Sequence, residues 1–163
     1  MLAASTNDRT RIVPREAAAW LATVHTAVLH CLRVPLQGRP VISTSRSLLD
    51  YLGADMKHLR HERFRVLFLT TKNELIAEDL VWDGTVGEAP AYPREIIKRA
   101  LEVGATGLII VHNHPSGSHA PSPQDIEATR RINAAASHMG ICLHDHLVLS
   151  RSGWCSLRAM NLL

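Results

Sequence analysis

The run of four aliphatic residues at positions 108–111 limits what this chain can fold into more than any other feature. Its length and its lack of polar alternation predict a fully buried strand over residues 106–111. The strand leads directly into His112, Asn113 and His114. Because positions i and i+2 of an extended chain point to the same side, the two imidazoles can reach one ion together.

The other apolar patterns predict helices and strands in a mixed order. Pro93 and Pro123 are typical of the first turn of a helix, and Gly104 and Gly140 are typical of helix ends. The predicted elements are strands at 64–69 and 75–82, a helix at 92–103, the buried strand, a helix from 122 to about 138, and strands at 141–149 and 153–157. The first two strands read as an antiparallel hairpin. This order predicts an α/β fold, a three-layer sandwich around a mixed β-sheet.

The first third of the chain is predicted to be mainly helical, after a polar start at residues 1–12 that we expect to fray. An amphipathic helix is expected from Pro14 to about Leu32, and its buried stripe would consist of Trp20, Leu21, Val24, Val28, Cys31 and Leu32. A second short helix is expected from Ser45 or Ser47 to Tyr51, ended by Gly53. Prolines and a glycine at residues 35–40 mark a linker. We therefore expect an N-terminal helical extension at 1–40 and one domain at 41–163.

The composition restricts the class of protein. The 163 residues are 46% apolar and 20% charged with a formal net charge of +3, which is ordinary for a soluble domain and does not by itself indicate nucleic-acid binding. The three cysteines are widely spaced and lack a C-x-x-C pair, as in reducing compartments. No apolar run approaches the ~20 residues that cross a bilayer, and no signal-peptide core is present. We expect a cytoplasmic protein without a membrane partner.

Asp125 adds a carboxylate at the third position of a predicted helix, behind Ser122 as its N-cap. Two imidazoles and a carboxylate suit Zn²⁺, and three protein ligands leave one position open, as in catalytic zinc sites. A capping motif or a His-x-His pair alone is commonly without such a role. Their combination, in the structural contexts that the chemistry requires, predicts a metal site formed by His112, His114 and Asp125.

The segment from His112-Asn113-His114-Pro115-Ser116-Gly117 to Pro121-Ser122-Pro123-Gln124-Asp125 resembles the JAMM motif of the JAB/MPN metallopeptidases. The sequences of residues 64–69, 92–95 and 145–149 are similar to the bacterial RadC branch of that family. The resemblance covers about residues 41–159. It implies a cytidine-deaminase-like three-layer sandwich, a zinc ion held by His112, His114 and Asp125, and a hydrolytic water.

The resemblance also implies roles for other residues. Glu62, just before the first strand, occupies the place of the general base, with Glu74 and Glu78 as alternatives if the register differs. The Ser122 hydroxyl would donate to the oxyanion of a tetrahedral intermediate. Asp145 and His146 would be structural or would orient a zinc-bound imidazole, whereas His119 is expected to be an ordinary surface histidine.

Three functions remain open from the sequence. The first is a JAMM-type metallopeptidase that hydrolyses peptide or isopeptide bonds of a substrate whose identity the sequence does not give. The second is a DNA-repair-associated or nucleic-acid-binding factor of the RadC type without peptidase activity, and the third is a non-catalytic scaffold. DNA binding is weakened because the first forty residues lack a recognisable helix-hairpin-helix, and the scaffold is disfavoured by the intact ligand set. A nucleoside deaminase would need a Pro-Cys-x-x-Cys element and a zincin a His-Glu-x-x-His helix, and both are absent.

Overall fold

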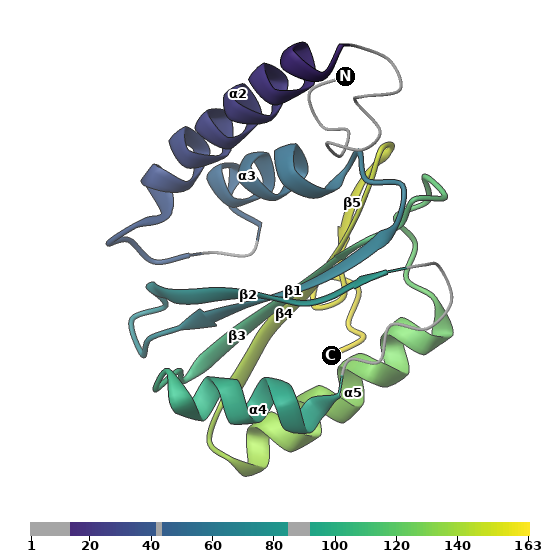
Figure 1. Cartoon of the computed structure of the whole chain (residues 1–163). Coiled ribbons are helices and arrows are strands. Elements are labelled where there is room, and N and C mark those ends of the chain that lie inside the picture. The colour runs from purple at the N-terminus through teal and green to yellow at the C-terminus, as the bar shows by residue number, and fades with distance from the viewer. Residues whose placement is uncertain (1–13, 42–43, 85–91) are drawn as a thin grey trace.

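The computed structural model describes residues 14–41, 44–84 and 92–163 of the chain. Its helices and strands, in chain order, are α2 (Arg15–Arg33), the 3₁₀ turn η1 (Val34–Leu36), α3 (Arg46–Met56), β1 (Glu62–Leu69), β2 (Leu75–Gly84), α4 (Pro93–Glu102), β3 (Gly107–Asn113), α5 (Pro123–His138), β4 (Cys142–Ser150) and β5 (Gly153–Ser156). The strands form one five-stranded sheet in the order β2-β1-β3-β4-β5. Figure 1 shows this sheet between two sets of helices.

The sheet is mixed, as predicted. β1 pairs antiparallel with β2 on one side and with β3 on the other, and β4 pairs antiparallel with β5. β3 and β4 are parallel. Two parallel neighbours need a crossover connection, and α5 supplies it. The three-layer α/β sandwich predicted from the order of the elements is therefore confirmed.

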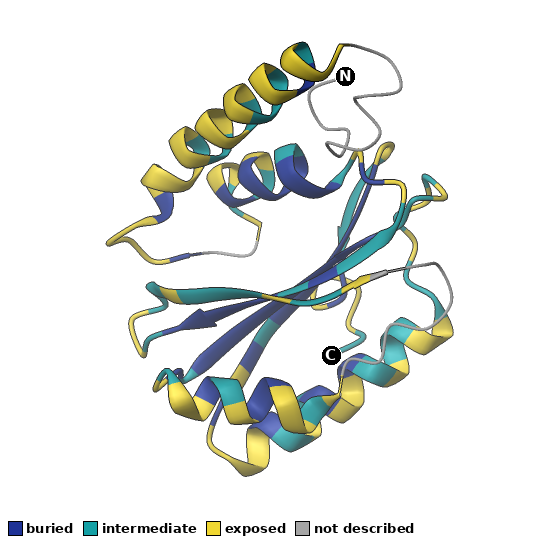
Figure 2. Cartoon of the chain, in the orientation of Figure 1, coloured by how far each residue is buried: buried dark blue, intermediate teal, exposed yellow. Residues whose placement is uncertain are grey.

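The two faces of the sheet carry separate apolar cores. Leu67, Ile109 and Leu147 belong to the core beneath α3, whereas Val66 and Ile110 belong to the core beneath α4 and α5. Figure 2 shows these strands buried between the helices, whose outer faces are exposed. Because side chains alternate along a strand, His112 lies on the same face as Ile110, toward α5.

α2 is a helix as predicted, but the expected buried stripe is wrong in four of its positions. Trp20, Val24 and Val28 are 72%, 44% and 40% exposed, and Cys31 is exposed as well. Ala18 is buried instead, and Leu29 and Leu32 pack against the core beneath α3. Packing against α3 decides which side of this helix is covered, and the periodicity of α2 alone does not show it.

α3 has its N-cap at Ser45, the first of its two expected starts, and the Ser45 hydroxyl accepts a hydrogen bond from the Leu48 amide. It does not end at Gly53 but continues to Met56. Leu48, Leu52 and Met56 are all buried and follow one another at intervals of four residues. Burial of this stripe outweighs the ~1 kcal/mol by which glycine disfavours a helix interior.

The segment Arg15–Leu36 is long and apolar enough, by length and composition, to cross a membrane, contrary to the expectation that no segment approaches this limit. Core helices of soluble proteins and N-terminal signal sequences pass the same test, so it does not make α2 a membrane span. Cytoplasmic location and a domain boundary at residue 40 stay predictions. The expected fraying of residues 1–12 lies outside the described residues.

Candidate metal centre

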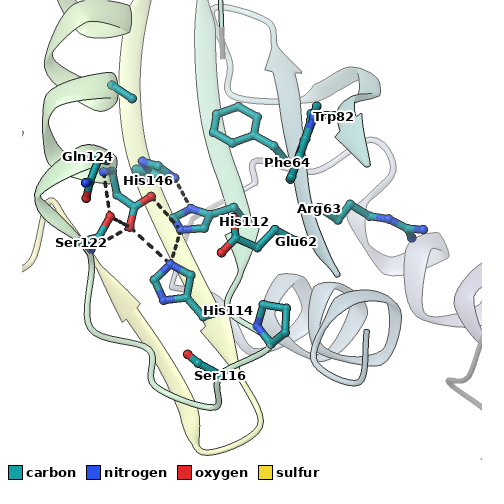
Figure 3. A pocket seen from close by; sticks show the side chains of 13 residues that line it. Glu62, Arg63, Phe64, Trp82, His112, His114, Ser116, Ser122, Gln124 and His146 are labelled. Carbon is teal, nitrogen blue, oxygen red and sulfur yellow. Dashed lines mark hydrogen bonds and ion pairs between the residues drawn. The ribbon is translucent and has the colours of Figure 1, made fainter. Parts of the chain in front are cut away.

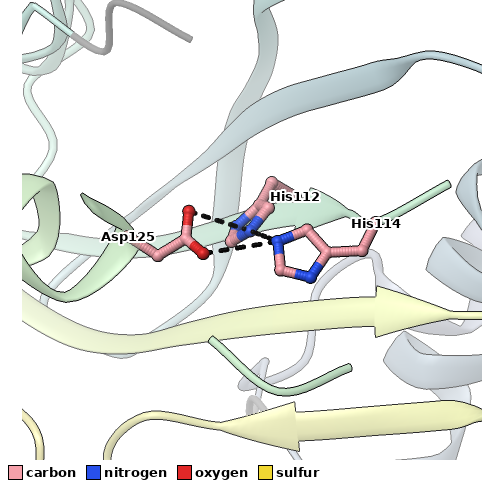
Figure 4. A group of neighbouring side chains, drawn as sticks. All are labelled: His112, His114 and Asp125. Carbon is pink, nitrogen blue, oxygen red and sulfur yellow. Dashed lines mark hydrogen bonds and ion pairs between the residues drawn. The ribbon is translucent and has the colours of Figure 1, made fainter. Parts of the chain in front are cut away.

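The end of β3 and the start of α5 bring the three predicted ligands together. The Nε2 atoms of His112 and His114 lie 2.9 Å apart. Asp125 places one carboxylate oxygen 3.2 Å from Nε2 of His112 and the other 3.3 Å from Nε2 of His114. Figure 4 shows the three side chains converging on one point. Among the described residues, His112, His114 and Asp125 form a group of three potential metal ligands. One ligand atom from each lies within 4.8 Å of the other two.

Hydrogen bonds at the far side of each ring indicate which tautomer each histidine adopts. Nδ1 of His114 lies 3.1 Å from the Ser118 carbonyl oxygen, which can only accept, so Nδ1 carries the proton. Nδ1 of His112 lies 2.7 Å from Nε2 of His146. If Nδ1 of His112 also donates, the Nε2 atoms of both rings present lone pairs to each other and to a carboxylate. Such an arrangement is repulsive unless a cation lies between them.

His146 contacts His112, as Figure 3 shows, and its other ring nitrogen continues a line of hydrogen bonds into α5. Its Nδ1 lies 2.6 Å from the Thr129 hydroxyl, and that hydroxyl donates to the Asp125 carbonyl oxygen at 2.5 Å. Since the hydroxyl proton goes to the carbonyl, Nδ1 of His146 donates and its Nε2 accepts from His112. Burial holds the pKa of His146 well below its usual value, in agreement with a neutral ring. The predicted orienting role fits the position of His146.

Thr129 takes part in these hydrogen bonds, and its part was not predicted from the sequence. It lies one helical turn after Asp125 on α5 and is fully buried. A threonine inside a helix commonly bonds the carbonyl four residues earlier, so its presence alone carries no signal. Its spacing from Asp125, together with a histidine on the neighbouring strand, is the only hint that the sequence contained.

Asp125 combines helix capping with its place in the cluster. The Ser122 hydroxyl accepts from the Asp125 amide at 3.1 Å, and the Asp125 carboxylate accepts from the Ser122 amide at 2.7 Å, which is a reciprocal capping box. Burial acts to raise the pKa of Asp125, but the contacts with His112 and His114 outweigh it and hold this pKa well below its usual value. The carboxylate is therefore ionised, as a metal ligand must be.

The proton and a metal ion compete for the same nitrogen of His114. The hydrogen bond to Asp125 raises the pKa of His114, against the effect of burial, which lowers it. The cluster thus favours a positive charge at its centre. Either a proton on His114 or a bound cation can supply that charge.

Ser122 lines the same pocket as His112 and His114, but its hydroxyl is engaged with Asp125. It donates to the Asp125 carboxylate at 2.7 Å while it accepts from the Asp125 amide. A hydroxyl has one proton to give. Donation to a substrate oxygen would therefore require this proton to leave Asp125.

Glu62 is the first residue of β1 and lines the same pocket as His112 and His114. Figure 3 shows its side chain on the side of the pocket where these two imidazoles lie. The alternatives lie elsewhere. Glu78 accepts a hydrogen bond from Tyr51 and pairs with Arg65 beneath α3, and Glu74 belongs to the turn between β1 and β2.

The pocket above the ligands has a volume of about 360 Å³ and apolar as well as polar walls. Phe64 stacks on His112 with ring centroids 6.3 Å apart and contacts His146 edge-on. The remaining lining side chains come from β1, β2, the segment after β3 and α5: Arg63, Trp82, Pro115, Ser116, Gln124 and Ala128. Cavities of this size hold small molecules or short peptide segments.

The structure does not place Asp145 at the cluster. Its carboxylate accepts from the Ser156 hydroxyl at 2.7 Å and from the Arg158 amide at 3.2 Å, so it fastens the chain after β5 to β4. That is the structural one of its two expected roles. His119 bonds the Ser152 hydroxyl at 3.1 Å and is half-buried.

The donor set fits zinc. A tetrahedral ion with ligand bonds of ~2.0–2.1 Å separates its ligand atoms by roughly 3.3 Å. The three distances among the ligand atoms run from 2.9 to 3.3 Å. Imidazoles whose outer nitrogens are hydrogen-bonded, and an ionised carboxylate held by a helix cap, are the ligands that zinc requires.

Comparison with known proteins gives a consistent family assignment. The model of the RadC-like JAB domain family matches residues 42–162. A UPF0758 protein of Rhodobacter capsulatus is 48% identical over 143 residues, which are 88% of this chain and 67% of that relative. A UPF0758 protein of Ruegeria pomeroyi is 49% identical over 127 residues, which are 78% of this chain and 57% of that relative. The chain thus spans about two thirds or less of the length of these relatives.

Proposed function

Because the chain belongs to the family of RadC-like JAB domains, we propose that it is a zinc-dependent hydrolase of amide bonds, with peptide or isopeptide bonds as its substrates. The observation that carries the proposal is the convergence of two Nε2 atoms and one carboxylate within 3.3 Å of each other. Three protein ligands leave a coordination position free, which is the ligand count of catalytic zinc sites.

Zinc bound at this centre would supply Lewis acidity and lower the pKa of water to about 7. The residues of the chain would divide the remaining tasks. His146 orients His112, and Ser118 orients His114, so both ligands keep fixed directions. Asp125 supplies the negative charge that balances part of the ion's charge.

Glu62 is the proposed general base. A carboxylate on the same side of the pocket as the ligands can take a proton from water and later deliver it to the leaving amine. Ser122 is proposed to stabilise the oxyanion by transferring its hydrogen bond from Asp125 to the substrate oxygen. The pocket, bordered by Phe64 and Trp82, would receive the residues next to the scissile bond.

Metal content tests the centre. The protein should bind one equivalent of Zn²⁺ after dialysis against a chelator, measured by calorimetry, and gain thermal stability from it. His114→Ala should lose both effects. His119→Ala is the matched control, because that histidine lies in the same connection but bonds Ser152. If the unchanged protein binds no stoichiometric zinc and His114→Ala alters neither property, the metal centre does not exist.

Hydrolysis tests the chemistry. The zinc-loaded protein should cleave members of a complex peptide mixture, followed by mass spectrometry of new termini. Glu62→Gln should keep zinc and lose activity by about 10²–10⁴-fold, the usual contribution of a general base. Full hydrolysis by Glu62→Gln would show that Glu62 is the wrong base. Non-peptidase nucleic-acid binding remains the alternative prediction, and salt-dependent DNA binding without cleavage of peptides would favour it.

A further inference from the structure

Asn113 lies between the two histidine ligands but faces the other way. Successive side chains of a strand point to opposite faces, so His112 faces α5 and Asn113 faces the α3 side of the sheet. Asn113 is 1% exposed. A buried amide without partners would be strongly destabilising, so its hydrogen bonds indicate its role.

Both hydrogen bonds of the Asn113 side chain go to the backbone on either side of Glu62. Its Oδ1 accepts from the Arg63 amide at 2.8 Å, and its Nδ2 donates to the His61 carbonyl oxygen at 3.0 Å. Glu62 is thus held from both neighbours by the residue that separates His112 from His114. These two bonds hold the backbone around Glu62 without any contact to the Glu62 side chain.

The Asn113 side chain takes over where the strand pairing between β1 and β3 stops. The paired register runs from Leu69 opposite Gly107 to Phe64 opposite His112. Beyond that point the Arg63 amide and the His61 carbonyl meet the Asn113 side chain. The backbone of Asn113 is meanwhile paired with Leu149 of β4, which keeps the residue itself in place.

Only a side-chain amide can make both bonds. The Arg63 amide needs an acceptor and the His61 carbonyl needs a donor, and Asn has one of each at the required separation. Aspartate would keep the first bond and oppose a carbonyl oxygen with a buried charge. Serine is too short to span both groups.

We propose that Asn113 is a positioning residue, which fixes the backbone of Glu62 relative to the ligands His112 and His114. This inference rests on the proposed function, since it concerns how the general base is aligned with the metal. Alignment matters because a misplacement of about 1 Å can lower a rate by about 10²-fold. Asn113 couples the base to the ligands because it is itself part of the strand that carries them.

The test uses the full chain loaded with Co²⁺, whose visible spectrum responds to the groups around the open position of the ion. Asn113→Ser removes the clamp without adding charge, and Asn113→Asp removes half of it. Both variants should bind Co²⁺ within about threefold of the original affinity, because no ligand or ligand partner is changed. The Arg63 amide should exchange faster with solvent deuterium in Asn113→Ser, and less so in Asn113→Asp, which keeps the oxygen that accepts from this amide. Asn133→Asp on α5 is the matched control and should change nothing.

The decisive readout is coupling to Glu62. Glu62→Gln should shift the pH midpoint of the Co²⁺ spectrum, and Asn113→Ser should shift it in the same direction. The double variant should match Glu62→Gln alone, because a base that is absent cannot be misplaced as well. Additive shifts, or an unchanged spectrum in Asn113→Ser, would overturn the inference.

Two further outcomes separate this inference from the proposed function. If Asn113→Ser loses Co²⁺ binding, Asn113 supports the ligands and not Glu62, and the inference is wrong while the metal centre stands. If the unchanged protein does not bind Co²⁺, the proposed function itself fails. Should Asn113→Asp not fold, Asn113→Ser gives the same comparison.

Discussion

Nδ1 of His112 lies 2.7 Å from Nε2 of His146, and both residues are buried. This contact links a ligand at the end of β3 to the neighbouring parallel strand β4. It aims the other nitrogen of His112 at the cluster, and Thr129 continues the line of bonds into α5. The direction of a metal ligand is thus set by two residues that do not touch the metal position.

His146→Leu should lower the affinity for Zn²⁺ by about 10–100-fold, the usual effect of losing the partner of a histidine ligand. His146→Gln should restore part of it, because the amide oxygen can still accept from His112. Calorimetric titration with Zn²⁺ measures both. His144→Leu, two residues earlier, is the control; an equal loss there would mean that the effect comes from disturbing β4 and not from the contact with His112.

Ser122→Ala tests capping against catalysis. Loss of the N-cap should lower the free energy of unfolding by about 0.5–2 kcal/mol. If the hydroxyl also stabilises the oxyanion, kcat should fall by about 10²–10³-fold. Ser45→Ala removes the N-cap of α3, away from the pocket, and should show the stability loss alone. Unchanged kcat in zinc-loaded Ser122→Ala would leave Ser122 with only its capping role.

Tyr51 should make the fold sensitive to alkaline pH. Burial, followed by the charge of Glu78, raises the pKa of Tyr51 from 10.0 to about 12. The stabilising effect of the neutral phenol is therefore complete below pH 10 and declines as the pH rises from 10 to 12, because the unfolded chain loses its proton first. Denaturant unfolding across this range should show a smaller decline for Tyr51→Phe. The exposed Tyr92 provides the control Tyr92→Phe, which should behave like the original protein.

Adjacent substitutions on α2 test which face of that helix is covered. Leu29→Glu should lower the free energy of unfolding by about 1–3 kcal/mol, because it buries an unpaired charge against the core beneath α3. Val28→Glu should change it by less than about 0.5 kcal/mol, since Val28 is 40% exposed. Chemical denaturation measures both, and the opposite ranking would mean that the predicted stripe was right.

The local sequence determined the elements that carry the centre. The buried strand, the proline-initiated helix and the Ser122 cap follow from residues within a few positions of each other, and all three are confirmed. Their ligands could be predicted because the geometry of a strand and of a capped helix is fixed by the backbone. The mixed order of elements likewise gave the layered α/β fold.

Contacts between distant residues were decided only by the tertiary structure. Leu108 pairs with Leu143 but Ile109 pairs with Asp145, so His144 is an extra residue in β4. This bulge reverses the alternation after Leu143 and turns His146, not Asp145, toward His112. A bulge has no reliable sequence signal, so Asp145 and His146 could not be separated beforehand.

The same limit applies to α2 and to Asn113. The covered side of α2 depends on how this helix packs against α3. Asn113 stands fifty residues after Arg63 in the chain, and only the antiparallel pairing of β1 with β3 brings its amide to the backbone around Glu62. The sequence by itself determined which residues can hold a metal ion, because that depends on local geometry. The packing of the sheet decided which groups orient those ligands and which carboxylate faces them, because these depend on register and on which surfaces are buried.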